Sequence, residues 1–548
     1  MTHDLLNHYL LPGLPVVACE YPHHPNDAHT ARGKRAVLAN LGVSYVLDLT
    51  EARDRLEPWP NDASFAPVRA RFPIPDGGVP NSLQAFDALI EELVDRVERG
   101  DTVAVHCWGG IGRTGVVCAA LLVRVGWPVE DALAEVHRLW RTVPKASHPH
   151  HASRTAPETD AQRDFVRTWA RAVSSRAPRS VGAAVSSRVA RACLLGGALG
   201  DALGAAVEFL SLDQIRARYG PAGVRRPMPA YAHACPITDD TQMTLFTAEG
   251  MLRALSRVQR SGAGERASWG VSDDLFVEAI GDAYVRWLHT QAPASVPASH
   301  RALAEPRGWL LAQPSLHSQR APGNTCLSAL RQFVTSDVPP RVARNQSKGC
   351  GTVMRVAPIG LVAATPQDAF ALAAATSALT HGHDTGIVAG GAFAVLVQQR
   401  ARGVPLVEAI AVARACCTSH EGHEQTVRAL DAAVQVATAR GDALDAHDLL
   451  TLGEGWVAEE ALAIAVACAW AQPESFVDAT CLAANLVRGD SDSTASMTGQ
   501  LVALGVGLER LPTQWLEVLE LREVITQVAD DLAIGWRAGA AWAARWPG

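Results

Sequence analysis

The hydrophobic periodicity of this chain changes part of the way along, and that change constrains the fold more than any single motif. Residues 1–172 alternate short buried-strand patterns with amphipathic helical ones, whereas residues 189–548 are helical in pattern almost throughout. Between them, VSSRAPRSVGAAVSSR (173–188) is rich in Ser, Ala, Arg and Pro and has little periodic apolar content. We therefore predict an α/β domain over 1–172, a linker over 173–188 and an all-α domain over 189–548.

Size and composition favour a cytoplasmic, multidomain protein. A chain of 548 residues exceeds one ordinary hydrophobic core. No apolar run approaches the roughly 18–20 residues of a membrane span, and MTHDLLNHYLLPGLP does not read as a signal peptide. The 11 cysteines include no CxxC pair, which favours reduced thiols. A net charge of −7 argues against general nucleic-acid binding and against attraction to anionic membranes.

The first domain carries a strand–loop–helix pattern near its centre. RAVLANLGVSYVLDLT predicts a helix end, a Gly turn and a buried strand around 45–49, and LQAFDALIEELVDRVERG predicts an amphipathic helix ended by Gly100. TVAVHC is then a short buried strand and TGVVCAALLVRVG the helix that follows it. A strand, a tight loop and a helix form an α/β unit.

The loop of that unit, within VHCWGGIGRTG (105–115), places five residues between Cys107 and Arg113. A Gly-rich loop at a helix N-terminus directs backbone N–H groups into its hollow, which together with the helix dipole suits a tetrahedral dianion. The planar fork of Arg113 can grip two phosphate oxygens. The same positive field favours the thiolate of Cys107, which can then attack phosphorus.

Neighbouring residues complete the predicted chemistry. Thr114 could donate a hydrogen bond to the Cys107 sulfur and ease its departure from a phospho-enzyme, while His106 would orient the loop from behind. RFPIPDGGVP (71–80) offers Asp76 as a proton donor on a loop that would close over the substrate. The expected substrate-binding residues of this domain are His106, Trp108, Gly109, Gly110, Ile111 and Gly112.

HCWGGIGRTG, with PIPDGGVP upstream, resembles the cysteine-dependent phosphatases of the protein tyrosine and dual-specificity superfamily over residues 1–172. The resemblance implies a central sheet flanked by helices, with Cys107 as nucleophile, Arg113 as phosphate clamp and Asp76 as general acid. Tyrosine-specific relatives position the hydrolytic water with a glutamine near PETDAQ, and Glu158 or Gln162 stands there in this chain. Two other interpretations stay open: a buried core thiol beside a Gly turn, and a phosphate-binding reader without turnover.

In the second domain, two helix starts far apart in sequence carry clustered acids. They are PITDDTQM (236–243) and RGDSDSTASMTG (488–499). Either segment alone would pass as helix capping. Together with GDALGAAVE (200–208) they favour a bound cation, because clustered carboxylates repel one another unless a hard ion lies between them. Such helix starts could bracket two metal ions roughly 3.5–4 Å apart.

Six motifs follow one another in an order similar to that of the ADP-ribosylglycohydrolases of the dinitrogenase-reductase-activating type: GDALGAAVEF, TDDTQM, GTVMRVAPIG, THGHDTGIVAGGAFA, GEGWVAEEALAIAV and GDSDSTASMTG. The resemblance implies a helical fold and cleavage of the ADP-ribose glycosidic bond through an oxocarbenium-like state, with Glu208 as a mobile acid near that bond. It also implies two Mg²⁺ ions, although some relatives prefer Mn²⁺. Their ligands would be Thr238, Asp239, Asp240, Asp490, Asp492 and Ser493.

The segment KGCGTVMRVAP (348–358) resembles the loop that wraps the pyrophosphate and distal ribose in that family. Members often have an Asn-Gly pair where this chain has Cys-Gly. The implied ligand contacts are Gly349, Cys350, Gly351, Thr352 and, lining the same pocket, His381.

Other conspicuous stretches favour structural roles. GGALGDALG has no preceding strand and no Lys, so helix packing explains it better than nucleotide binding. The histidines of SHPHHAS (147–153) resemble metal ligands, but adjacent histidines in a Pro loop rarely converge. Trp108 is expected to pack in the pocket wall, with stacking on the substrate as the alternative, and Trp456 is expected to be a packing anchor.

The sequence thus predicts a bifunctional hydrolase that joins a phosphatase to a Mg²⁺-dependent ADP-ribosyl hydrolase. Its substrates would be ADP-ribosylated and phosphorylated proteins or small molecules. Three rivals remain: the phosphatase fold serves only as a phosphate reader, the helical domain is only an ADP-ribose sensor, or it hydrolyses another N-glycoside.

Overall fold

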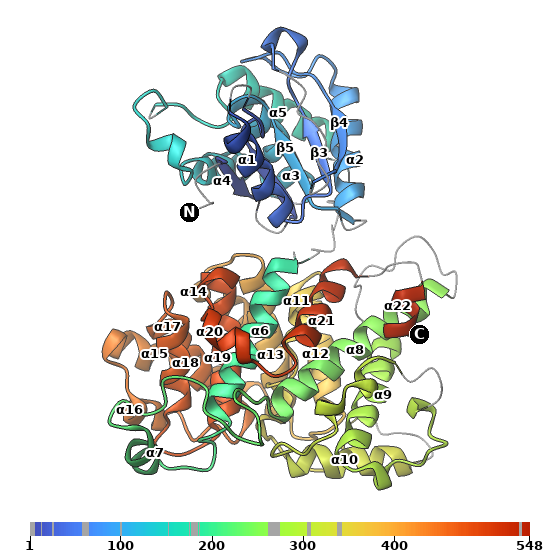
Figure 1. Ribbon diagram of the computed structural model, residues 1–548, viewed down its shortest axis with the longest axis vertical. Helices are drawn as coiled ribbons and strands as arrows, with labels where there is room; N and C mark the ends of the chain where they lie inside the picture. The colour runs from blue at the N-terminus through green and yellow to red at the C-terminus, as the bar shows by residue number, and fades with distance from the viewer. Residues whose placement is uncertain are drawn as a thin grey trace. The chain divides into compact units, whose positions relative to one another are not determined.

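The computed structural model describes residues 6–11, 14–24, 27–56, 65–98, 101–125, 127–151, 153–174, 176, 185, 187–260, 274–303, 308–336, 342–535 and 540–548. The chain divides into two compact units, Met1–Ser186 and Ser187–Gly548 (Figure 1). Most of the predicted linker, and the predicted helix end at Gly100, lie outside the described residues.

The first unit is built on a five-stranded sheet with the order β1-β2-β5-β3-β4. Only β1 runs antiparallel to its neighbour; the other three pairings are parallel. The strands are β1 (His8–Leu10), β2 (Val16–Cys19), β3 (Tyr45–Asp48), β4 (Val68–Arg71) and β5 (Val103–His106). Because β5 is central and hydrogen-bonded on both sides, all four of its residues are buried. The residues that follow it therefore start from a fixed point in the middle of the sheet.

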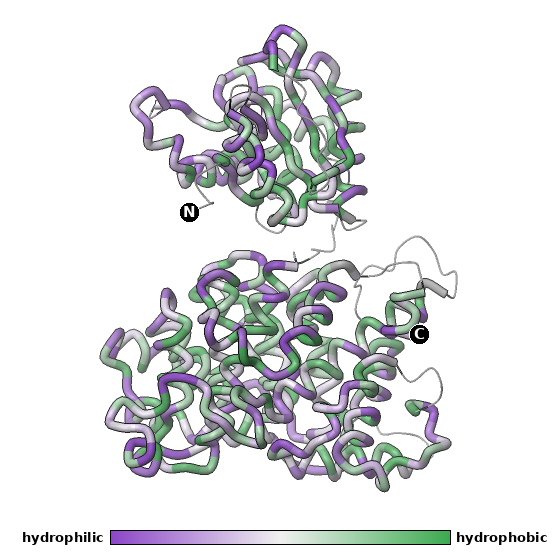
Figure 2. The backbone as a smooth tube through the Cα atoms, in the orientation of Figure 1, coloured by the Kyte–Doolittle hydropathy of each residue, from purple (hydrophilic) through white to green (hydrophobic). Residues whose placement is uncertain are grey.

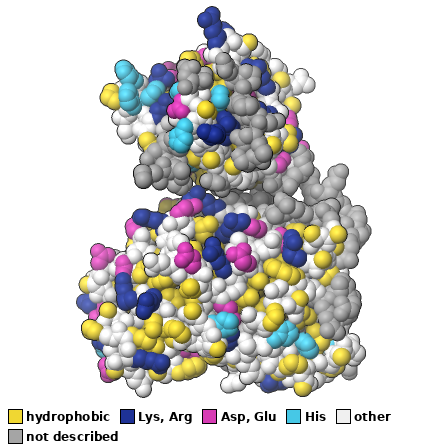
Figure 3. Space-filling model, viewed as in Figure 1, with side chains coloured by type: hydrophobic (Ala, Val, Ile, Leu, Met, Phe, Trp, Pro, Cys, Tyr) yellow, Lys and Arg dark blue, Asp and Glu magenta, His cyan; other side chains and the backbone are white. Residues whose placement is uncertain are grey.

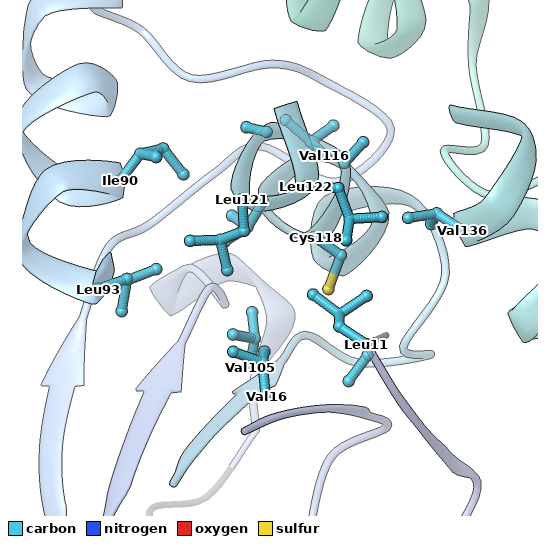
Figure 4. Close-up of a cluster of buried hydrophobic side chains, with 14 of the residues drawn as sticks. Leu11, Val16, Ile90, Leu93, Val105, Val116, Cys118, Leu121, Leu122 and Val136 are labelled. Carbon is cyan, nitrogen blue, oxygen red and sulfur yellow. The ribbon is translucent and has the colours of Figure 1, made fainter. Parts of the chain in front are cut away.

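Apolar side chains on the two faces of this sheet form two separate cores. Val105 of β5 belongs to the larger core and Ala104 to the smaller one, as the alternation of side chains along a strand requires. In Figure 4, Cys118 and Leu121 of the helix after β5 point towards the strand side of the core, where Val105 and Val16 lie. The helices of this unit are α1 (Ala28–Asn40), α2 (Leu83–Glu98), α3 (Gly112–Arg124), α4 (Val129–Trp140), α5 (Asp160–Val173) and the short turns η2 (Ala52–Asp54) and η3 (Pro144–Ser147).

The second unit is helical, and its described residues contain no β-strand, only isolated bridges. Its α-helices are α6 (Ser187–Gly204), α7 (Leu212–Tyr219), α8 (Asp239–Arg260), α9 (Asp274–Gln291), α10 (Asn324–Thr335), α11 (Ala357–Val362), α12 (Pro366–Ala378), α13 (Asp384–Ala401), α14 (Leu406–Cys417), α15 (Glu424–Arg440), α16 (Ala446–Leu450), α17 (Ala458–Ala471), α18 (Phe476–Ala484), α19 (Ser491–Val506), α20 (Thr513–Val518), α21 (Arg522–Ile534) and α22 (Ala540–Arg545). Its short 3₁₀ turns are η4 (Pro293–Ser295), η5 (Arg301–Leu303), η6 (Leu310–Ala312), η7 (Pro314–Leu316), η8 (Cys350–Thr352), η9 (Gly441–Ala443) and η10 (Leu508–Arg510).

Helices α6 and α19 pack along each other in the interior of this unit (Figure 1). The two helices approach so closely that glycine is required at the contact. A Cβ on Gly200 would lie 2.0 Å from the carbonyl oxygen of Ala495, and one on Gly204 would lie 2.4 Å from the Cα of Asp492. The end of α6 is thereby held against the start of α19. The glycines of GGALGDALG serve this packing, as the sequence predicted.

The predicted fold class is confirmed: an α/β unit with a central sheet precedes an all-helical one. In both units the tube is green along the packed interior, and purple is prominent in the connecting segments (Figure 2). On the face of the second unit seen in Figure 3, basic and acidic side chains are interspersed rather than gathered in a patch of one sign. Among the described helices, none combines the length and apolar character that a membrane crossing requires.

Candidate active sites

The first site lies where β5 ends and α3 begins. Cys107 follows the last residue of β5, and the loop turns through Gly110, whose φ of +72° suits glycine. A Cβ on Gly110 would also lie 2.8 Å from the backbone of Cys19 and Glu20, so the loop is held tightly against the end of β2. Cys107 is only 3% exposed, at the bottom of the loop.

Two neighbours of the cysteine occupy the places that the sequence predicted for them. Thr114 Oγ1 donates a hydrogen bond to Cys107 Sγ at 3.2 Å. His106 lies buried behind the loop, with Nδ1 3.3 Å from the carbonyl oxygen of Cys107 and 3.9 Å from Asp48 Oδ1. Burial lowers the pKa of His106, which favours its neutral form as a fixed support.

Arg113 presents one edge of its guanidinium to the protein and the other to the site. Nη1 donates to Asp54 Oδ2 at 2.6 Å and to the carbonyl oxygen of Ile74 at 3.3 Å. Nη2 pairs with Asp76 Oδ1 at 2.9 Å, and Nε has no hydrogen-bond partner among the described residues. The Nε–Nη2 edge is therefore the one available to two oxygens of a phosphate once Asp76 moves.

Asp54 was not foreseen from the sequence. It ends the short turn η2 after β3, and its side chain is 5% exposed. Burial alone would raise its pKa, but the hydrogen bond from Arg113 helps to hold the pKa below its ordinary value. The available signal was its position, since acids that follow the carboxyl end of a parallel strand lie at the edge where ligands bind.

The loop of Asp76 is tied to α5. The Asp76 side chain is 66% exposed, while Gln162 is buried and donates through Nε2 to the carbonyl oxygen of Gly78 at 2.9 Å. Gln162 Oε1 accepts from the backbone N–H of Glu158 at 2.9 Å, and the Glu158 carboxylate pairs with Arg154 at 3.2 Å. Nε2 of Gln162 thus holds the loop, while its Oε1 caps the start of α5.

The rim of the first site departs from expectation at Trp108. Its side chain does not pack in the pocket wall, since Trp108 is 57% exposed. The backbone holds it in this orientation, because the carbonyl oxygen of Trp108 accepts a hydrogen bond from Tyr21 N–H.

The histidines of the 147–153 loop lie close to one another: the rings of His148 and His150 stack 5.2 Å apart. Within the described part of the chain, these histidines belong to no group of three His, Cys, Asp or Glu side chains that could hold a metal ion.

The second site is a cluster of buried carboxylates at three helix ends. Asp239 and Asp240 begin α8, Asp490 caps α19 with Asp492 in its first turn, and Asp201 lies near the end of α6. Each of these side chains belongs to a residue no more than 5% exposed, and Thr238 and Ser493 lie buried beside them. The close packing of α6 on α19 brings these ends together.

Asp201 holds the start of α8 from outside that helix. Its Oδ2 accepts from the backbone N–H groups of Thr238 at 3.0 Å and Thr241 at 3.2 Å. The carboxylate thus caps α8 and leaves Asp239 and Asp240 to face the other acids.

Burial and mutual repulsion make the ionised cluster unfavourable without a cation. Burial, followed by repulsion from neighbouring acids, raises the pKa of Asp239, Asp240 and Asp492, and raises that of Glu208 to about 9. Asp240 Oδ1 and Glu208 Oε2 are buried without a hydrogen-bond partner in the described ranges. An all-oxygen set of carboxylates and hydroxyls is the donor chemistry that Mg²⁺ and Mn²⁺ prefer.

The acidic side chains of this cluster are nevertheless not arranged as a complete set of metal ligands. Across the residues that the structure describes, no three His, Cys, Asp or Glu side chains converge in a way that could hold an ion as they stand. The donor types and the unpartnered oxygens suit a cation, and the side chains would have to move to surround one.

The 348–352 loop lies against this cluster. Cys350 is anchored by its backbone N–H, which donates to the carbonyl oxygen of Trp456 at 3.1 Å, and its Sγ lies 2.7 Å from Asp490 Oδ2. The thiol thus faces a predicted metal ligand. Gly351 and Thr352 follow Cys350 in η8, and a Cβ on Gly349 would lie 3.2 Å from His381 Nε2. Burial lowers the pKa of His381 to about 3, so its imidazole is neutral at physiological pH.

Three aromatic residues lie near the acids. Trp456, expected to be a packing anchor, is 40% exposed and stacks with Phe209, itself 70% exposed, at a ring separation of 6.1 Å. Phe209 comes directly after Glu208.

Tyr231 is the third of these aromatic residues. It adopts a φ of 50°, and burial and repulsion from Glu208 raise its pKa to about 12. It lines a wide-open surface cavity of about 510 Å³ together with His233, Pro314, Ser315, Ser318, Gln319 and Arg320.

Comparisons with known proteins address each unit. Residues 181–541 match the family model described as ADP-ribosylglycohydrolase, and residues 23–127 match the one described as polymorphic toxin system, DSP-PTPase phosphatase. An uncharacterized protein of Archaeoglobus fulgidus is 28% identical over 353 residues, which are 62% of this chain and 95% of that protein.

Solved structures give matches of the same two kinds. One described as an ADP-ribosylglycohydrolase-related protein complex is 24% identical and covers 64% of this chain and 97% of its own, with a TM-score of 0.43. The structure of Tk-PTP in the active form is 25% identical and covers 30% of this chain and 97% of its own, with a TM-score of 0.24. The chain belongs to the ADP-ribosylglycohydrolase family, and ahead of that domain it carries a phosphatase domain of the dual-specificity type.

Proposed function

We propose that both units are catalytic and that the chain is a bifunctional hydrolase. The first unit would cleave phosphate monoesters through a phosphocysteine at Cys107, and the second would release ADP-ribose from a modified target with the help of two bound Mg²⁺ ions. Phosphorylated and ADP-ribosylated proteins or small molecules would be the substrates.

The phosphatase proposal rests on the way Arg113 is held: one side of its guanidinium is fixed by the protein, and the other side can bind a phosphate. Asp54 occupies Nη1, so the guanidinium is already oriented when Nε and Nη2 receive a phosphate. Cys107 Sγ would attack phosphorus, and Asp76, displaced from Nη2, would protonate the leaving oxygen. The hydrogen bond from Thr114 would stabilise the sulfur when water cleaves the phosphocysteine.

The observation that carries the glycohydrolase proposal is the set of buried acids with unpartnered oxygens. Thr238, Asp239, Asp240, Asp490, Asp492 and Ser493 would hold the two metal ions, with Mn²⁺ as an alternative to Mg²⁺. The ions would supply Lewis-acid binding of the ribose hydroxyls.

Protein groups would manage the rest of this second reaction. In the metal-free protein, burial and the neighbouring acids raise the pKa of Glu208 to about 9. Burial would still favour the protonated carboxyl beside bound ions, and Glu208 would donate that proton to the leaving group as the glycosidic bond breaks. The cavity beside Tyr231 offers room for the leaving group next to the start of α8, since the carbonyl oxygen of Arg320 accepts from Asp239 N–H.

The test of the glycohydrolase is ADP-ribose release from matched arginine-, serine- and DNA-linked substrates. It is run with Mg²⁺, with chelator and with Asp240→Ala. Metal-dependent release from one linkage, lost in the variant, is the expected result and identifies the leaving group. Binding of ADP-ribose without release from any linkage would make the helical unit a sensor.

Hydrolysis of p-nitrophenyl phosphate tests the phosphatase. Loss of turnover in Cys107→Ser is expected. Equal turnover in the variant and the wild-type chain would leave this unit as a phosphate reader.

A further inference from the structure

The segment that follows β2 runs along the loop of the first site. A Cβ on Gly110 would lie 2.8 Å from the backbone of Cys19, and Tyr21 N–H donates to the carbonyl oxygen of Trp108 at 3.0 Å. Glu20 stands between these two contacts in the sequence, so its backbone is fixed beside the loop. Its side chain, which is 9% exposed, is therefore a fixed anchor for charges at the edge of this site.

Two ammonium groups share the Glu20 carboxylate. Lys34 Nζ lies 2.7 Å from its Oε1, and Lys145 Nζ lies 3.1 Å from its Oε2. Burial alone would raise the pKa of Glu20, but the two cations hold that pKa below its ordinary value, so the carboxylate stays ionised. Two positive charges against one negative charge leave this group with a net positive charge beside the loop.

Of the two lysines, Lys145 is the one nearest to the residues that follow the nucleophile. A Cβ on Gly109 would lie 4.0 Å from Lys145 Nζ, and Gly109 does not adopt a left-handed φ, so its missing side chain provides space rather than relief of strain. Asn7 Oδ1 accepts from the backbone N–H of Lys145 at 3.0 Å and fixes the start of that side chain. The Lys145 side chain is 23% exposed, and one of its three N–H donors has a partner among the described residues, which leaves two for a ligand.

We propose that Lys145 makes the first site selective for phosphate monoesters whose leaving group carries a second anionic group, with a second phosphate as the preferred form. This inference rests on the proposed phosphatase function of the same site. Arg113 and the loop N–H groups would hold the scissile phosphate, and the Lys145 ammonium would contact the second anion across the space that Gly109 leaves open. A lysine ammonium suits this role, because it is a compact point charge that binds phosphate without a fixed geometry.

The test compares three esters on the full-length chain: 1,3-phenylene bisphosphate, 3-carboxyphenyl phosphate and phenyl phosphate. Their second group carries about two, about one and no negative charge at neutral pH. Comparison of Lys145→Met with the unmutated chain on the same ester cancels the intrinsic reactivity of that ester. The kcat/KM should fall by about tenfold for the bisphosphate, by less for the carboxylate and least for phenyl phosphate, and high salt should reduce these differences. Lys145→Arg, which keeps the charge, should restore most of the preference.

Lys34→Met is the matched control. It removes the same charge from the same Glu20 carboxylate, whereas Lys145 is the lysine nearest to Gly109. The control should therefore change the kcat/KM of the three esters to a similar extent. Equal reductions for all three esters in Lys145→Met, or the same graded loss in Lys34→Met, would overturn the inference.

Calorimetric titration of Cys107→Ser separates this inference from the phosphatase proposal, because it measures binding without turnover. The variant should bind the bisphosphate more tightly than phenyl phosphate, and the difference should disappear when Lys145→Met is added. A difference in affinity without turnover of any ester by the unmutated chain would refute the phosphatase proposal alone and leave Lys145 as the specificity residue of a phosphate reader. Equal affinities for the two esters would refute this inference, whether or not the chain is a phosphatase.

Discussion

The two sites of this chain solve opposite electrostatic problems in opposite ways. The main groups of the phosphatase site come from one loop between β5 and α3. Its positively charged side chain, Arg113, is paired with the carboxylates of Asp54 and Asp76. The glycohydrolase site collects acids from helix ends far apart in sequence and leaves Asp240 Oδ1 without a partner among the described residues. The charge of the first site is neutralised by protein groups, whereas in our proposal the acids of the second site would be neutralised by a bound cation.

Reciprocal inactivation is the largest expected effect. Cys107→Ser should lower phosphatase turnover by on the order of 10⁴-fold or more, because the nucleophile is lost, and leave ADP-ribose release unchanged. Asp240→Ala and chelator should do the reverse. Both activities measured on the same preparations check this, and a loss of both in either variant would mean that the sites are not independent.

Replacement of the proton donor should show whether Asp76 acts as more than a partner of Arg113. Asp76→Asn should reduce kcat by about 10²- to 10⁴-fold for a poor leaving group such as an alkyl phosphate. The reduction should be much smaller for p-nitrophenyl phosphate, whose leaving group needs little protonation. Equal reductions for the two substrates would refute the general-acid role.

Asp54→Asn should separate orientation of Arg113 from the chemical step. The lost charge-assisted hydrogen bond contributes about 1.5 kcal/mol, which corresponds to a rise in KM of about tenfold. Glu51→Gln is the control, because Glu51 immediately precedes the same turn and pairs with Arg53 rather than with Arg113. A similar effect of both variants would indicate a general change of charge rather than a contact.

The smallest effect concerns stability without metal. The folded-state pKa of Glu208, about 9, lies above its ordinary value near 4.5, so the folded protein retains a proton that the unfolded chain releases. The stabilisation is complete below about pH 4.5 and is lost as the pH rises towards 9. The Tm of the chelated protein should therefore fall by a few degrees across this window. Glu208→Gln should flatten the dependence, and Mg²⁺ should weaken it. A Tm that rises with pH in the chelated protein would contradict the charge repulsion inferred here.

Much of the fold could be predicted because its signals are local. Helical periodicity, the Gly turn before β3 and the strand–loop–helix around Cys107 each depend on neighbouring residues, and the fold class that they predicted is confirmed. Asp54 could not be assigned, because an acid in a short turn looks like any solvated acid until β3 and β5 are paired. The exposure of Trp108 could not be predicted, because large aromatic side chains are usually buried and only the backbone path of the loop turns this one outward.

The position of the Cys350 thiol shows what a family resemblance alone does not predict. The family pattern predicted a ligand-binding loop around 349–352, which remains a prediction. The contact of the thiol with Asp490 depends on how η8 meets the start of α19, and no local pattern encodes that meeting.

The packing of α6 on α19 has a consequence for the order in which the activities arise during synthesis. A ribosome makes the first unit whole before it starts α6, so the first unit would be able to fold, and to act as the proposed phosphatase, while the rest of the chain is still being translated. The glycohydrolase cannot, because α6 emerges first in its unit and its glycine face waits for α19, near the end, before the acids meet. A nascent chain stalled after α6 and before α19 would carry the first unit joined to an incomplete helical segment in which the acids of the second site have not yet come together. Translation itself would then release the two activities one after the other.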